Sequence, residues 1–316
     1  MDSIIEVDNL TKDYGFGRGV FDVSFKVGKG EVFGFLGPNG AGKSTTIRHL
    51  MGFSKPDKGQ TKIFGKSTFD RYYEILNHVG YIPGEIALPQ GLTGIEFLHM
   101  MQSLQKIHNE LRLNELLDLF QLDSVTLKGE TKRMSLGVKR KLAIVAAFMS
   151  DPEVLILDEP TSGLDPVMQE VFIEFIKKEK ERGKTILLSS HIFTEVDATC
   201  DRIAIIKDGR IVSEFIANDL KHAKTKFYQI EFESKKDYED FCSANRKSKI
   251  MKILNTNDEQ NQLMISTHDD KINEVVDQLS NYKIAEFTNI KETLEDYFMK
   301  FYKEDKNFGG VQWKKK

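Results

Sequence analysis

The arrangement of hydrophobic and polar residues predicts several strands in the first part of the chain. Residues 4–10 and 20–27 are rich in alternating apolar positions, which predicts strands of an N-terminal antiparallel sheet. Residues 202–212 predict two more strands, joined by a turn at Asp208 and Gly209. Three short runs are instead apolar nearly throughout, as in buried parallel strands: residues 31–36, 154–157 and 185–190. The pattern predicts an α/β fold with a mixed sheet at its core.

The spacing of apolar residues becomes helical between about residues 88 and 150. Thr93 and Glu96 fit a capping box at the start of a helix that runs to about residue 104. A second helix is predicted to begin near Asn109, and a third just after Ser135. This segment therefore predicts a helical subdomain inserted between the strands.

A second domain is predicted after residue 221. Strand-like and helix-like segments follow one another there in the order βαββαβ, with one more helix at the end. This order indicates a small α+β domain of the ferredoxin-like type over residues 222–303, without a recognisable chemical motif. The first domain would then span residues 1–221, and residues 304–316 are predicted to be a flexible tail.

Composition narrows the range of partners. Of the 316 residues, 40% are hydrophobic and 29% are charged, with a formal net charge of −3, so no nucleic-acid partner is expected. Cys200 and Cys242 are far apart and fit no metal or redox spacing, so we expect free thiols in a reducing compartment.

Any link to a membrane is expected to go through a partner. No stretch approaches the ~18 consecutive apolar residues of a membrane-spanning helix, and residues 142–149 are about the longest apolar run. The N-terminus also lacks the basic and apolar regions of a signal peptide.

A glycine-rich loop follows the apolar run at residues 31–36. It fits the pattern G-x-x-x-x-G-K-[ST] and comprises Gly37, Pro38, Asn39, Gly40, Ala41, Gly42, Lys43, Ser44 and Thr45. Backbone N–H groups of such a loop, and the helix N-terminus after it, bind a phosphate group. We expect Lys43 to reach the β- and γ-phosphates and Ser44 to be a magnesium ligand. The alternative is a glycine-rich turn without function.

Two acids stand at the carboxyl end of a predicted buried strand. Asp158 is expected to bind magnesium, and Glu159 to polarise the attacking water as a general base. Paired acids after an apolar run are also found at exposed strand ends, but a phosphate loop in the same chain favours a phosphoryl-transfer site. Ser135 and Gly137 open a predicted helix, which offers a second anion-binding terminus. His191 lies at another strand end.

In order, spacing and residue identity, these motifs resemble those of the nucleotide-binding subunits of ATP-binding-cassette transporters. The resemblance implies that Tyr14 stacks on adenine and that Ser135 and Gly137 belong to the family signature. It also implies that Asp165 lies in the loop linking two sites and that His191 is a catalytic residue that senses the γ-phosphate. Lys43 and Glu159 would be the other catalytic residues.

The resemblance covers about residues 4–220 and implies a P-loop NTPase fold that binds ATP and Mg²⁺. Two such domains dimerise head-to-tail, so that each ATP lies between one chain's phosphate loop and the other chain's signature helix. The second domain would be another copy of this chain or a paralogue. A transmembrane permease would hold the pair at the cytoplasmic face of the cell membrane.

Two departures from the family pattern stand out. Leu136 and Val138 replace a glycine and a glutamine of the signature. Gly84 stands where the family carries a glutamine that binds magnesium. Glu85, one position on, offers carboxylate oxygens, and Gln90, six positions on, offers an amide. We hypothesise that Glu85 takes over part of this metal-binding role. The alternative is a simple loop carboxylate.

The variant at residues 84–85, the altered signature and the second domain resemble the branch that exports drugs, antibiotics or peptides. We therefore expect an ATPase that powers export through a separately encoded permease. One alternative is a regulatory module that uses ATP to control a membrane complex. Another is a ribosome-acting cassette protein, although those carry two cassettes in one chain and this chain has one phosphate loop.

Overall fold

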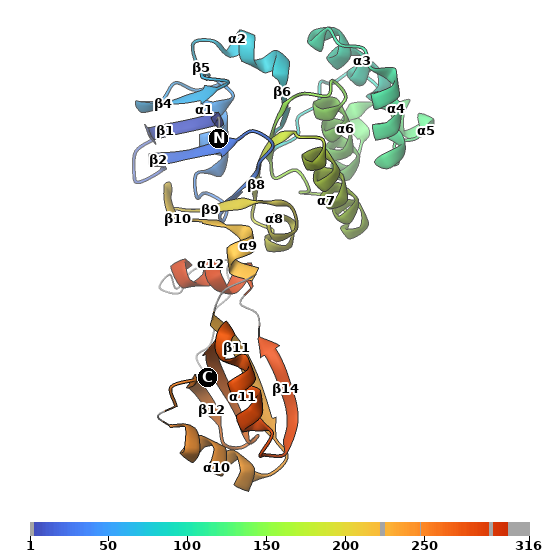
Figure 1. Ribbon diagram of the computed structural model, residues 1–316. Coiled ribbons are helices and arrows are strands. Elements are labelled where there is room, and N and C mark those ends of the chain that lie inside the picture. The colour runs from blue at the N-terminus through green and yellow to red at the C-terminus, as the bar shows by residue number, and fades with distance from the viewer. Residues whose placement is uncertain (1–2, 222–224, 247, 291–292, 303–316) are drawn as a thin grey trace. The chain divides into compact units, whose positions relative to one another are not determined.

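The chain forms two compact units, Met1–Ala217 and Asn218–Lys316 (Figure 1). The computed structural model describes residues 3–221, 225–246, 248–290 and 293–302. The tail predicted at residues 304–316 lies outside the described residues. Among the described residues, no helix is both long and apolar enough to cross a bilayer.

An antiparallel sheet forms the N-terminal part of the first unit. Its strands, in spatial order, are β2 (Gly19–Gly28), β1 (Ser3–Asp13), β4 (Lys58–Ile63) and β5 (Lys66–Ser67). In β1, Val7 pairs with Phe25 on one side and with Thr61 on the other. The alternating pattern of the first two strands buries Phe25 against Phe33 of the next sheet, with ring centroids 5.0 Å apart. The predicted N-terminal antiparallel sheet is confirmed.

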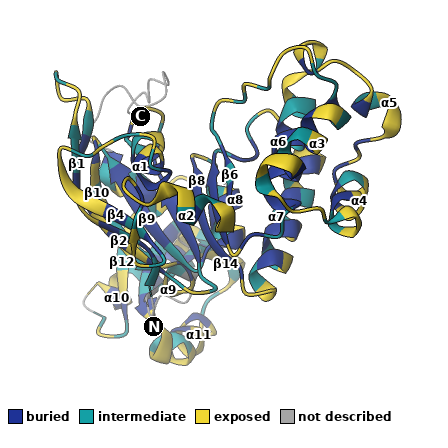
Figure 2. Ribbon diagram, turned by 90° about the horizontal axis from the view of Figure 1, so that it is seen from above, coloured by how far each residue is buried: buried dark blue, intermediate teal, exposed yellow. Residues whose placement is uncertain are grey.

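A six-stranded sheet forms the centre of the first unit. Its strands, in spatial order, are β10 (Arg210–Ile216), β9 (Arg202–Lys207), β3 (Val32–Leu36), β8 (Thr185–Ser190), β7 (Val154–Asp158) and β6 (Val79–Ile82). Neighbours pair in parallel except β9 and β10, which form the predicted hairpin. Every residue of β3, β7 and β8 is buried, as their continuous apolar runs predict (Figure 2).

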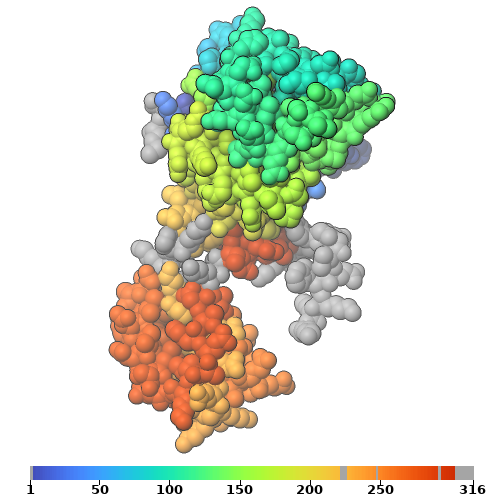
Figure 3. Space-filling model, turned by 90° about the vertical axis from the view of Figure 1, so that its right-hand side faces the viewer, coloured from blue at the N-terminus to red at the C-terminus, as the bar shows by residue number. Residues whose placement is uncertain are grey.

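The helices of the first unit are α1 (Lys43–Leu50), α2 (Tyr72–Ile75), α3 (Gly94–Gln105), α4 (Glu110–Leu119), α5 (Ser124–Leu127), α6 (Leu136–Phe148), α7 (Pro166–Glu181) and α8 (Phe193–Thr199). Of these, α3 to α6 form the predicted helical part. Helix α9 (Ala217–Lys221) begins at the last residue of the first unit. Thr93 and Glu96 form the predicted capping box of α3, and Ser135 caps α6. In space-filling form, the green and yellow-green side chains of this helical part cover the face of the first unit that Figure 3 shows.

The second unit has the predicted order βαββαβ followed by a helix. Its elements are β11 (Thr225–Phe232), α10 (Lys235–Asn245), β12 (Met251–Asn257), β13 (Gln262–His268), α11 (Ile272–Leu279), β14 (Ile284–Ile290) and α12 (Leu294–Tyr302). The sheet order is β12-β13-β11-β14 and all pairs are antiparallel, which is the ferredoxin-like arrangement. Its own core includes Ile230, Phe241 and Ile265, each fully buried. The predicted fold class is confirmed.

Candidate nucleotide-binding site

The glycine-rich loop joins the buried strand β3 to helix α1. Gly42 caps α1 with a φ of 112°, a left-handed conformation that favours glycine. A Cβ atom at Gly42 would also lie only 2.8 Å from Val20 Cγ1, so no larger residue fits. The N–H groups of the first turn of a helix have no acceptor within the helix, so the start of α1 offers them to an anion.

The loop is fastened to the hairpin of β9 and β10. The N–H of Gly209, in the turn of that hairpin, donates to the carbonyl of Ala41 over 2.9 Å. The carbonyl of Gly209 in turn accepts from the N–H of Phe21 on β2, over 2.8 Å. Backbone from both sheets therefore holds the loop in place.

Lys43 lies folded back against the loop and is only 5% exposed. Its ammonium donates to the carbonyl of Gly37 over 2.6 Å and to that of Pro38 over 3.2 Å. The same ammonium lies 2.9 Å from Oε1 of Glu159. The lysine of the loop and the predicted general base are thus in direct contact.

Glu159 connects Lys43 to His191. It follows β7 with a φ of 51°, and its N–H donates to the carbonyl of Ser189. Its Oε2 atom lies 2.5 Å from Nδ1 of His191, whose side chain is 48% exposed. The three predicted catalytic residues, which come from three segments of the chain, therefore form one continuous polar chain.

Asp158 ends β7 and is buried, with 2% exposure. Its Oδ1 atom accepts a hydrogen bond of 2.5 Å from Ser189 on β8. Oδ2 accepts none among the described residues, and a Cβ atom at Gly84 would lie 3.0 Å from it. Burial, with the nearby Asp158 charge, raises the pKa of Tyr81 to about 12, so the phenol stays neutral beside the carboxylate. Asp158 thus keeps one carboxylate oxygen open.

This donor set fits magnesium only together with substrate oxygens. The side chain of Ser44 is exposed at the start of α1, and among the described residues it has no hydrogen-bond partner. No group of three or more His, Cys, Asp or Glu side chains in the described ranges could hold a metal by itself. Magnesium is commonly held by one or two carboxylates together with phosphate oxygens. An open carboxylate oxygen and a free hydroxyl match that requirement.

The signature segment lies beside the loop that follows Glu159. The Ser135 hydroxyl accepts from the N–H of Val138 over 3.3 Å at the start of α6. A Cβ atom at Gly137 would lie 3.0 Å from the carbonyl of Gly163. Asp165 caps α7 and accepts from the N–H of Met168 over 3.0 Å. Ser135, Gly137 and Asp165 are thus placed at two adjacent helix starts.

Tyr14 and Glu85 are exposed. Tyr14 lies between β1 and β2 with 54% exposure, and the ammonium of Lys12 is 5.9 Å from its ring centroid. Glu85 follows β6, and among the described residues its carboxylate has no hydrogen-bond or ion-pair partner. Gly84 rather than Glu85 is the residue placed against Asp158. The metal-binding role of Glu85 stays a hypothesis.

Sequence reasoning missed three residues of this site. Ser189 binds Asp158, and Ser190 donates a 2.5 Å hydrogen bond to the buried carboxylate of Glu195. Arg140, in α6, donates to the backbone carbonyls of Pro83 and Gly84, which precede the acids in sequence, and of Ser162, which follows them. Their positions in the sequence could have indicated them. The two serines end an apolar run, and Arg140 follows the signature by a few residues.

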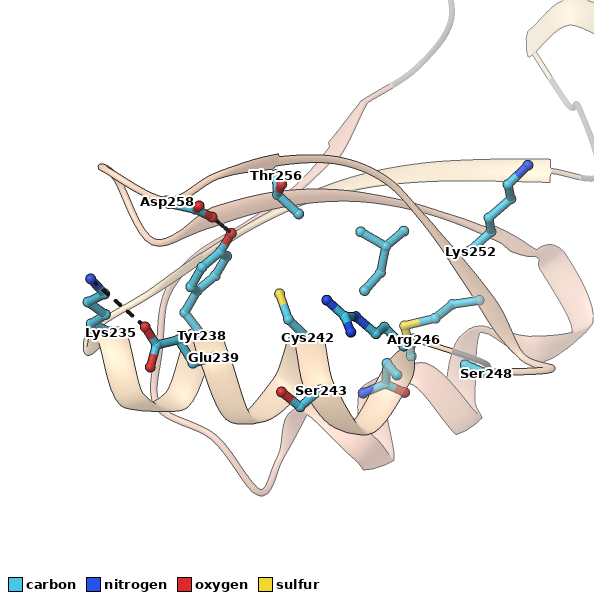
Figure 4. Close-up of a pocket in the computed structure, with 13 residues that line it drawn as sticks. Lys235, Tyr238, Glu239, Cys242, Ser243, Arg246, Ser248, Lys252, Thr256 and Asp258 are labelled. Carbon is cyan, nitrogen blue, oxygen red and sulfur yellow. Dashed lines mark hydrogen bonds and ion pairs between the residues drawn. The ribbon is translucent and has the colours of Figure 1, made fainter.

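A separate cavity of about 810 Å³ lies in the second unit, between α10 and β12 (Figure 4). Tyr238 donates to Asp258 at one end, and Arg246 points towards Cys242 near the other. None of the predicted site residues lines it.

Comparison with known proteins places these features in a family. The family model described as ABC transporter matches residues 20–162. An uncharacterized ABC transporter ATP-binding protein of Bacillus subtilis, YhcH, is 32% identical over 97% of this chain and 98% of its own length. The bacitracin transport ATP-binding protein BcrA of Bacillus licheniformis is 39% identical over 73% of this chain and 76% of its own.

A solved structure agrees with the sequence relatives. It is a dimeric ATP-binding cassette in a post-hydrolysis state, bound to ADP and Pi. It is 25% identical, with a TM-score of 0.61, and the match covers 67% of this chain and 98% of that one. The order and placement of the motifs agree with this likeness, and the chain belongs to the ATP-binding proteins of ABC transporters.

Proposed function

We propose that this chain is the ATP-hydrolysing subunit that powers export of a drug, antibiotic or peptide through a separately encoded membrane permease. The observation that carries the proposal is the polar chain of Lys43, Glu159 and His191 beside the buried Asp158. The bacitracin transport relative supports the choice of cargo.

Binding would begin at the phosphate loop. Backbone N–H groups of the glycine-rich loop and of the start of α1 surround the phosphates. Lys43 turns from the carbonyls of Gly37 and Pro38 to the β- and γ-phosphates, because an anion attracts an ammonium more strongly than a carbonyl dipole does. The exposed ring of Tyr14 stacks on adenine.

Hydrolysis would then depend on the oxygen of Glu159 that Lys43 has left. That oxygen accepts the proton of the attacking water, while His191 holds the other oxygen and so orients the carboxylate. Ser44 and Asp158 would hold a magnesium ion, which would supply positive charge against the phosphate oxygens.

A second nucleotide domain would complete the site. Ser135 and Gly137 at the start of α6 contribute N–H groups to the ATP of the partner, and the loop before Asp165 links the two sites. The partner is a second copy of this chain or a paralogue, and the dimeric solved cassette supports this arrangement. A transmembrane permease holds the pair at the cytoplasmic face of the cell membrane.

Substitution of Glu159, the proposed general base, tests the proposed mechanism of ATP hydrolysis. The purified chain is expected to hydrolyse ATP slowly, and Glu159→Gln is expected to abolish turnover and remain an ATP-bound dimer in gel filtration with light scattering. Glu174→Gln, on the exposed face of α7, is the matched control and keeps wild-type turnover. A Glu159→Gln variant that stays monomeric and still hydrolyses ATP would refute the mechanism.

The transport role has its own test. The chain is tagged in its native cell, and the proteins that purify with it from membranes are identified. A multi-span permease is expected, and its reconstitution with this chain in vesicles should give ATP-dependent movement of cargo. Recovery of ribosomes in place of a permease overturns the transport role, and a permease complex that moves nothing favours the regulatory alternative.

A further inference from the structure

Arg140 is one of the largest fully buried side chains of the protein, with 1% exposure. It lies in α6, little more than one helical turn after Ser135, which caps that helix. Arg140 therefore belongs to the same helix as the signature residues at the start of α6.

The guanidinium of Arg140 joins three segments by hydrogen bonds to backbone carbonyls. Nε donates to Ser162 over 2.9 Å, in the loop that follows the two acids. Nη1 donates to Pro83 over 2.9 Å, and Nη2 donates to Gly84 over 2.7 Å, in the segment after β6. Planar, fixed donors let one arginine hold all three carbonyls at once.

The charge of Arg140 is buried close to the acids without forming an ion pair. Among the described residues, no carboxylate lies within ion-pair distance of its guanidinium. Burial lowers its pKa, and the charges of Asp158 and Glu159 act in the opposite direction. An arginine stays charged in proteins, so the three carbonyls compensate part of the cost of burying that charge.

Gly84 is the link from Arg140 to the metal-binding acid. A Cβ atom there would lie 3.0 Å from Oδ2 of Asp158, so the Cα of Gly84 faces the open carboxylate oxygen and a side chain would crowd the space between them. The carbonyl of the same residue is held by Arg140. Arg140, a residue of helix α6, therefore holds the Gly84 backbone in its place relative to Asp158.

We propose that Arg140 is a positioning residue that ties the start of helix α6 to the Asp158 carboxylate, through the backbone of Pro83 and Gly84, and to the loop at Ser162. A shift of α6 on engagement of the second nucleotide domain then moves the Gly84 backbone relative to the metal-binding acid. Since the route runs through backbone, it needs no side chain at residue 84. The inference rests on the proposed function, because it assigns Asp158 to magnesium.

The test compares Arg140→Gln with a matched arginine in the full chain. Arg112→Gln removes a partly buried arginine that pairs with the buried Glu179, away from the acids, so it reports simple loss of stability. For each protein, the dissociation constant of a non-hydrolysable ATP analogue is measured in EDTA and again in excess Mg²⁺. The ratio of the two constants gives the gain in affinity that magnesium provides, without any turnover.

Arg140→Gln is expected to bind the analogue in EDTA within about twofold of wild type, because the phosphate loop is untouched. It is expected to lose about tenfold of the magnesium-dependent gain, the usual cost of removing a group that orients a metal ligand. Arg112→Gln is expected to keep the full gain even where its thermal midpoint falls. Equal gains in both variants overturn the proposal.

Arg140→Lys keeps the proposal testable if Arg140→Gln does not fold. An ammonium retains the charge but lacks the planar fork, so a partial loss of the gain is expected, and a full gain overturns the proposal. A wild-type chain that shows the magnesium-dependent gain but no hydrolysis refutes the proposed function and leaves the role of Arg140 standing. A wild-type chain that hydrolyses ATP beside an Arg140→Gln variant with an undiminished gain refutes only the role of Arg140.

Discussion

The Nδ1 atom of His191 lies 2.5 Å from the Oε2 atom of Glu159. The two residues directly follow the neighbouring parallel strands β7 and β8, which end at Asp158 and Ser190. Because Oε1 of Glu159 faces Lys43, each carboxylate oxygen has a separate partner. The imidazole and the ammonium together therefore orient the carboxylate.

Removal of that imidazole should impair turnover more than binding. His191→Ala is expected to lower kcat for ATP hydrolysis by about 100-fold, the low end for a group that assists proton transfer. The KM for ATP should change little, since Lys43 and the loop are intact. His78→Ala, which removes an exposed imidazole beside Glu153, is the control for steady-state assays. An unchanged kcat in His191→Ala would show that Glu159 is oriented without the histidine.

The hypothesis that Glu85 helps to bind magnesium can be tested directly. Glu85→Ala is expected to raise the Mg²⁺ concentration needed for half-maximal hydrolysis, by about threefold for the loss of one exposed oxygen ligand. The control is Glu174→Ala, which removes an exposed carboxylate on α7. If Glu85→Ala leaves both turnover and its magnesium dependence unchanged, Glu85 is a loop carboxylate.

The buried Glu195 should make stability depend on pH. Burial raises its pKa from the ordinary 4.5 to about 7, although Ser190 donates to it. Between these values the unfolded chain releases the proton and the folded chain keeps it, so the free energy of unfolding falls as pH rises and levels off above pH 7. The whole shift corresponds to about 3 kcal/mol.

Glu195→Gln should remove this dependence, because its amide stays neutral at every pH. Denaturant unfolding at pH 5 and pH 8 is expected to show a smaller loss of stability in the variant than in wild type. Glu174→Gln, an exposed change, should follow the wild-type profile. Parallel profiles for wild type and Glu195→Gln would mean that Glu195 is ionised in the folded state.

The second unit should fold without the first. Its sheet and helices enclose their own core, which includes Ile230, Phe232 and Phe241. A fragment of residues 218–316 is expected to unfold in one cooperative thermal transition followed by circular dichroism. The complementary fragment 1–217 should bind ATP within about threefold of the whole chain, since separate cores fold separately. Non-cooperative melting of the first fragment contradicts this division.

Short-range features of the fold could be predicted from the sequence. The phosphate loop depends on a few consecutive residues, among them Gly42 and Lys43, and its flanking strand and helix follow from local periodicity. The antiparallel N-terminal strands and the βαββαβ order also follow from alternation and helical spacing. In each case the determining interactions lie within one or two neighbouring elements.

Long-range polar contacts could not be predicted in this way. The bond between Ser189 and Asp158 depends on the register of two strands that are separated in sequence by a helix. The partners of Arg140 are backbone carbonyls, which every residue has, so no residue type marks them. Such contacts become visible only when the segments are placed in space.

The hydrogen bond between Gly209 and Ala41 has a consequence for synthesis of the protein. The phosphate loop is among the first parts of the chain to leave the ribosome, but the turn that fastens it belongs to a hairpin near the end of the first unit. Local strands and helices form early, whereas this closure must wait for residues far along the chain. A ribosome-bound chain that ends before β9 and β10 would therefore contain the phosphate-loop sequence but lack the hydrogen bond that holds the loop in place.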